Sequence, residues 1–250
     1  MRVNPAARLL LALLLCAALG FAATACGGGD DDQAQPSPPA GTEPENGDET
    51  DTGPVEEPPI EPQEMLQQFL QAVEDESPRA WDLVAAQTKR TFEFTQEHFM
   101  EVLLPTLKEE LEPGGAVVFQ ERIDERRALV VVESGTEDAP FAAPLRVEDG
   151  TWKIELFYPE FTPNRPEPGE EVQVGDEQLL LDVVRRADQA MEVRVWLDGE
   201  PIQVELENVG TFVNTYTTTL NVTQGRHLVV AHALTDAGQS GAAAWTFVGR

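Results

Sequence analysis

The chain has little positive charge and very few cysteines. Its 250 residues contain 17 Lys and Arg against 45 Asp and Glu, which gives a formal net charge of −28 at pH 7. A surface of this sign repels polyanions, so nucleic acid is not expected as a partner and anionic lipid headgroups are poor ones. The only cysteines are Cys16 and Cys26.

Long apolar runs are also absent beyond the N-terminus. The single long one, residues 9–22, follows the positive residues Arg2 and Arg8 and precedes the small residues Ala23-Thr-Ala25. This pattern is typical of a secretory signal peptide, and we expect residues 1–25 to be one. An uncleaved anchor and plain secretion are the alternatives, but the run falls short of the roughly 18–20 apolar residues that a membrane span needs.

The segment Leu19-Gly-Phe-Ala-Ala-Thr-Ala-Cys26 resembles the lipobox of bacterial lipoproteins, with Ala23 where that motif usually has leucine. The resemblance implies that Cys26 is lipidated and becomes the mature N-terminus. The thiol is the nucleophile that takes a diacylglyceryl group as a thioether, and several acyl chains anchor stably where one holds reversibly. Because Cys16 lies in the discarded signal, the mature chain then has no internal disulfide.

Residues 26–62 are expected to form a disordered, acidic, proline-rich linker. From Gly27 to Pro62 there is no Lys or Arg, and Val55 and Ile60 are the only large apolar residues. Such a segment buries too little apolar area to offset the entropy of ordering it. At this length it spans roughly 30–35 Å. Calcium binding at residues 30–32 is the alternative, but a mobile acidic run is a poor calcium cage.

Three helices followed by a sheet are expected within residues 63–161. Leu66, Phe69, Leu70 and Val73 recur at helical spacing. Further helices are expected to begin near residues 77 and 95, and Pro105 is expected to kink or restart the third. The period then changes to two, which predicts strands at 117–123, 128–133, 141–147 and 151–157, the last two joined by a hairpin turn at 148–150.

This order of elements, closing on Asp149-Gly-Thr-Trp-Lys-Ile154, resembles the nuclear transport factor 2-like fold. The resemblance implies a cone, in which a curved sheet wraps a long helix and leaves a pocket. The fold hosts enzymes and non-catalytic modules alike, so it does not decide function. The ionisable candidates for the pocket are His98, Asp82, Asp124 and Tyr158. None of them forms a spaced pair, so we expect no catalytic residue, no cofactor and no enzyme.

Residues 168–250 are expected to form a second module after a proline-rich junction at 161–169. Seven short strand-like runs separated by turn residues indicate a β-sandwich. The segments Trp196-Leu-Asp-Gly199 and Trp245-Thr-Phe247 resemble bacterial immunoglobulin-like domains. His227 and His232 are five residues apart on one strand and therefore face opposite sides. We expect one at the core edge and one exposed, and no metal site.

The sequence therefore predicts an α+β protein, a nuclear transport factor 2-like cone followed by an immunoglobulin-like sandwich. The expected function is that of a lipid-anchored bacterial cell-envelope protein, outside the membrane, with a non-catalytic binding or scaffolding role. The expected partners are the membrane, through lipid on Cys26, and an envelope protein or small ligand that the sequence does not identify. The alternative is a small-ligand carrier or pocket enzyme using the cone.

Overall fold

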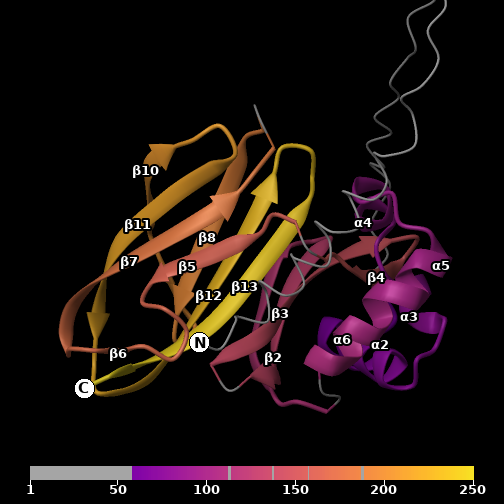
Figure 1. Ribbon diagram of the computed structural model, residues 1–250, viewed down its shortest axis with the longest axis horizontal. Coiled ribbons are helices and arrows are strands. Elements are labelled where there is room, and N and C mark those ends of the chain that lie inside the picture. The colour runs from indigo at the N-terminus through magenta and orange to yellow at the C-terminus, as the bar shows by residue number, and fades with distance from the viewer. Residues whose placement is uncertain (1–57, 112–113, 137, 157, 187–188) are drawn as a thin grey trace, which may run out of the picture. The chain divides into compact units, whose positions relative to one another are not determined.

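The computed structural model describes residues 58–111, 114–136, 138–156, 158–186 and 189–250 (Figure 1). The signal peptide expected at 1–25, Cys26 and most of the linker expected at 26–62 lie outside these residues, and all three stay predictions. In the described part, 51% of residues are in strands and 21% in helices. The described part is thus mostly β, and the expected α+β class is wrong.

Short helical segments come first in the described chain. They are α2 (Pro62–Glu74), α3 (Arg79–Leu83), α4 (Ala86–Thr91), α5 (Gln96–His98), the π-helical η1 (Phe99–Leu103) and α6 (Leu104–Glu110). The apolar stripe predicted for α2 is buried. Thr95 caps α5, because its Oγ1 accepts a hydrogen bond from the His98 backbone N–H at 3.1 Å. Pro105 lies in the first turn of α6, where the helix restarts after η1 as expected.

The first sheet is an antiparallel meander in the order β1-β2-β3-β4. Its strands are β1 (Val117–Asp124), β2 (Arg127–Thr136), β3 (Ala139–Glu148) and β4 (Thr151–Ile154). The turn between β3 and β4 has positive φ at both Asp149 (50°) and Gly150 (70°). This is the geometry that matches the twist of a two-residue hairpin, so the predicted turn is confirmed.

The remaining strands form two further sheets. One has the order β10-β11-β7-β5 and the other β6-β13-β12-β8-β9. Their bounds are β5 (Phe161–Arg165), β6 (Glu171–Val172), β7 (Gly175–Val184), β8 (Met191–Leu197), β9 (Glu200–Ile202), β10 (Glu205–Val209), β11 (Val213–Val222), β12 (Gly225–Thr235) and β13 (Ser240–Gly249).

These two sheets enclose one buried apolar cluster that includes Leu181, Tyr216, Trp245 and Phe247. The predicted β-sandwich is therefore confirmed. Strand β5 lies in the expected junction but pairs with β7 as part of the sandwich. The described residues form one compact unit, and the expected division between residues 161 and 168 stays a prediction.

A second apolar cluster joins the meander to the sandwich. It contains Phe119, Leu129 and Val131 from β1 and β2, and Trp196, Val230 and Ala244 from β8, β12 and β13. The rings of Phe119 and Trp196 lie 5.4 Å apart. Figure 1 shows β2 and β3 beside β13, and β3 contacts β13 directly. Both faces of the meander are thus covered, one by helices and the other by the sandwich.

The expected nuclear transport factor 2-like cone is wrong. The longest described helix, α2, has 13 residues, and the stretch after Thr95 is broken into three segments. The meander packs between helices and a second sheet instead of wrapping a long helix. The expected succession of helices followed by a four-stranded sheet is present, although six described helical segments replace the three expected. Such a succession does not determine what covers the second face of a sheet.

Candidate functional site

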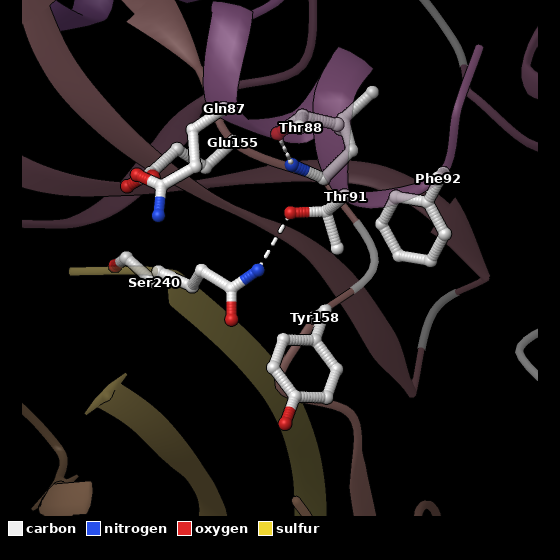
Figure 2. A pocket seen from close by; sticks show the side chains of 9 residues that line it. Gln87, Thr88, Thr91, Phe92, Glu155, Tyr158 and Ser240 are labelled. Carbon is white, nitrogen blue, oxygen red and sulfur yellow. Dashed lines mark hydrogen bonds between the residues drawn. The ribbon is translucent and has the colours of Figure 1, made fainter. Parts of the chain in front are cut away.

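A small pocket lies where α4, the chain just after β4 and the start of β13 meet (Figure 2). It is lined by Gln87, Thr88, Thr91, Phe92, Glu155, Leu156, Tyr158, Gln239 and Ser240. Its cavity volume is about 10 Å³. That is about the space that one water molecule needs, so the pocket is too small for an organic substrate.

Hydrogen bonds at this pocket connect α4 and the chain after β4 to the sandwich. Gln239 Nε2 donates to Thr91 Oγ1 at 2.6 Å, as Figure 2 shows. The Tyr158 hydroxyl donates to Gln189 Oε1 at 2.5 Å and accepts from the Arg186 backbone N–H at 2.6 Å. The polar side chains that line the pocket are thus hydrogen-bonded to one another or to neighbouring residues. Few of their groups are left to bind a ligand.

Glu155 is the buried ionisable side chain of the pocket. It is 3% exposed, and its Oε1 lies 3.4 Å from Arg146 Nη1. Its Oε2 accepts no hydrogen bond from the described residues. Burial raises the pKa of this carboxyl to about 7, and the attraction of Arg146 and Arg127 offsets only part of that effect. Strand alternation placed Glu155 on the outer face beside Lys153, so nothing in the sequence marked it as buried.

The two histidines face opposite sides of β12, as predicted. His232 is 1% exposed, its Nε2 lies 2.6 Å from Ser240 Oγ, and burial lowers its pKa to about 4. His227 Nδ1 lies 2.7 Å from Asp198 Oδ2. Both rings are buried, so the expectation that one is exposed is wrong, because the meander covers the second face of β12. The described residues contain no group of three side chains able to hold a metal.

The ionisable residues considered for a catalytic pocket do not meet. They are His98, Asp82, Asp124 and Tyr158, and within the described ranges no hydrogen bond or ion pair joins any two of them. The His98 ring stacks on Phe94 with centroids 5.7 Å apart. Asp124 pairs with Arg127 at 2.9 Å. Asp82 is exposed on α3, whereas Tyr158 alone reaches the pocket.

An exposed apolar surface lies at one edge of the sandwich. We define the apolar edge as Leu206, Val209, Phe212 and Val213, whose exposed fractions are 48%, 61%, 61% and 36%. These are four of the seven large apolar residues exposed in the described part. All five residues of β10 are exposed, and β10 is the outermost described strand of its sheet (Figure 1). Clusters of this kind mark interaction surfaces.

Arg185 holds the turn that carries the apolar edge. Its guanidinium donates to Gly210 O at 2.8 Å, to Asn214 Oδ1 at 3.0 Å and to Gln189 O at 3.1 Å. The Gly210 N–H donates to Val213 O at 2.8 Å, and a Cβ at Gly210 would lie 2.5 Å from that oxygen. The turn is therefore fixed by polar contacts, and the apolar side chains project from a defined backbone.

No family model matches this chain, and no curated protein matches it. Among solved structures, an engineered protein is 18% identical over 37% of this chain and 20% of that protein, with a TM-score of 0.29. The fibronectin(III)-like modules of CbhA from Clostridium thermocellum are 13% identical over 36% of this chain and 97% of that one, with a TM-score of 0.27. The aligned part thus spans a fifth of the engineered protein. The assignment of a sandwich rests on the two sheets and the buried apolar cluster between them.

Proposed function

We propose that the chain is a non-catalytic binding or scaffolding protein of a bacterial cell envelope, held outside the membrane by lipid on Cys26. The observation that supports a binding role is the apolar edge, four exposed apolar side chains on β10, on the start of β11 and on the turn between them, which Arg185 fixes. The lipobox-like segment that ends at Cys26 supports the location. No helix in the described ranges is long and apolar enough to cross a membrane.

Recognition through a surface agrees with how the described part is built. The sandwich, which we propose to be immunoglobulin-like, shares an apolar cluster with the meander, so each stabilises the other. The pocket beside Glu155 has room for about one water molecule. The alternative, a small-ligand carrier or a pocket enzyme, was to use the pocket of the cone, and the described residues do not form that cone.

The location is tested by replacing Cys26. Cells that produce the full chain are fed an alkyne-labelled fatty acid, and the protein is partitioned between detergent and water. Wild type should carry the label and enter the detergent phase, whereas Cys26→Ser should lose the label because serine forms no thioether. Cys16→Ser is the matched control and should behave as wild type. A labelled, detergent-soluble Cys26→Ser protein would show that Cys26 is not the anchor.

The binding role is tested by a photo-crosslinking amino acid placed at Phe212 or at Val174. Both side chains are exposed and apolar, but Val174 lies outside the apolar edge. Irradiated cells should yield a discrete adduct from position 212 and none from position 174. Equal adducts from both positions, or none from position 212, would contradict the proposed binding surface.

A further inference from the structure

We infer that β10 receives an added strand from a partner, an extended segment in which apolar residues alternate with lysine or arginine. This inference rests on the proposed function, because it identifies the kind of partner that the apolar edge binds. In this mode the partner's backbone pairs with the free side of an edge strand while its side chains provide specificity. Three features of β10 support it: its position, its apolar side chains and its charge.

The position of β10 leaves one side of its backbone available. It pairs with β11 on one side and is the outermost described strand of its sheet on the other. The register places Leu206 opposite Tyr216 and Val209 opposite Asn214. Tyr216 and Asn214 are buried on the inner face of the sheet, and opposite residues share a face. Leu206 and Val209 therefore point to the inner face at its open margin, where an added strand would cover them.

The charge of β10 selects among possible occupants. Glu205 and Glu207 are exposed on the strand, and Glu200 is exposed on the preceding β9. The neighbouring Arg185 is occupied by three hydrogen bonds to the turn. A basic segment would therefore bring opposite charges to β10, and opposite-charge pairs between neighbouring strands are stabilising.

The same charges exclude the occupants that the chain itself supplies. A second copy of β10 would place glutamates beside glutamates, and like charges across strands are destabilising. The acidic segment between Gly27 and Pro62 would be repelled in the same way. An edge that repels acidic strands and admits basic ones is selective.

The test uses the full chain, purified in a non-ionic detergent, and fluorescent peptides of about eight residues, a common strand length. The probe alternates valine and lysine, and its binding is followed by fluorescence anisotropy at low and at physiological salt. One comparison peptide alternates valine and glutamate. A second keeps the lysines but has proline in place of the central valines, which preserves charge and prevents strand pairing. We expect binding of the first peptide to be at least about tenfold tighter than that of either comparison.

Variants localise the binding to β10. The double variant Glu205→Lys with Glu207→Lys should lose the valine–lysine peptide and gain the valine–glutamate peptide, each by about tenfold or more. Glu64→Lys with Glu74→Lys makes the same charge change on exposed positions of α2 and should have little effect. Leu206→Ser should weaken binding, and Val174→Ser, also an exposed apolar position, should not.

Four outcomes would overturn the inference. They are equal binding of the valine–glutamate peptide, equal binding of the proline-containing peptide, equal losses in the α2 control, and self-association of the chain that Leu206→Ser abolishes. These failures are distinct from failure of the proposed function. A crosslinked partner at position 212 without peptide binding would refute only the added strand. A labelled, detergent-soluble Cys26→Ser protein would refute only the location.

Discussion

Glu155 and His232 are buried groups whose pKa values move in opposite directions. Burial raises the pKa of Glu155 from 4.5 to about 7 and lowers that of His232 from 6.5 to about 4. Between about pH 4.5 and 7 the folded chain holds a proton on Glu155 that the unfolded chain has lost. The contribution of Glu155 to the free energy of unfolding therefore falls as pH rises through this range. His232 has the opposite effect, because the unfolded chain binds a proton on this ring before the folded chain does. Its contribution to the free energy of unfolding therefore falls as pH falls from about 6.5 to 4. Between about pH 4.5 and 6.5 the two residues therefore change the free energy of unfolding in opposite directions as pH rises.

The variant Glu155→Gln isolates the pH dependence of stability that comes from Glu155. Glutamine keeps the shape without the charge, so the free energy of unfolding of the variant should rise relative to wild type between pH 4.5 and 7.5. A shift of this size corresponds to roughly 3 kcal/mol at most. Urea unfolding of both proteins across this range measures the difference. Glu97→Gln, an exposed position on α5, is the control. A difference that does not change with pH would show that Glu155 is charged throughout.

At the scale of single elements, β4 depends on Trp152. The indole is 1% exposed, on a strand that contacts α2 and α3. Truncation of a large buried aromatic side chain to alanine typically costs about 3–5 kcal/mol. Trp152→Ala should lower the free energy of unfolding by that amount, as measured by chemical denaturation. Lys153→Ala changes the next residue, which points outward and donates to Asp82 O at 2.7 Å, and should cost under about 1 kcal/mol. A loss of under about 1 kcal/mol for Trp152→Ala would instead place Trp152 at the surface.

The contact between β1 and β8 is also open to measurement. The Phe119 and Trp196 rings lie 5.4 Å apart at an angle of 56°. Aromatic pairs of this kind contribute about 0.5–1.5 kcal/mol beyond the area they bury. A double-mutant cycle with Phe119→Leu and Trp196→Leu should therefore give a coupling of that size. A coupling indistinguishable from zero would mean that the meander and the sandwich do not pack through these rings.

For the molecule as a whole, the shared cluster makes the sandwich depend on the meander. A fragment of residues 168–250 lacks β5 and exposes Trp196, Val230 and Ala244, which the meander covers in the full chain. We expect this fragment to bind a hydrophobic dye and to unfold with low cooperativity, and a fragment of residues 58–250 to unfold in one transition. Amide spectra and urea titrations compare the two. A well-dispersed spectrum with sharp unfolding of the shorter fragment would establish an independent domain.

The part of the chain that could be read in advance is the part governed by local pattern. The spacing of Leu66, Phe69, Leu70 and Val73 predicted the buried stripe of α2, and Asp149-Gly150 predicted the hairpin turn. The alternation of faces along β4 and β12 was also right. The alternation of side chains along a strand does not show whether a face of the sheet is exposed to solvent or buried under another layer. For that reason Glu155 and His232 could not be recognised as buried, and the apolar edge could not be recognised as exposed.

The sequence by itself determined the positions of most strands and of α2, because backbone preference and hydrophobic period act over a few residues. It did not reveal α4, β5 or β9. It also determined the acidity of the chain and the motif that ends at Cys26. Only the tertiary structure decided that the meander lies between helices and a second sheet, which replaced the expected cone. It alone shifted the pKa of Glu155, because desolvation depends on residues far away in the chain. It also left β10 as an edge, since strand order is decided by pairing between distant segments.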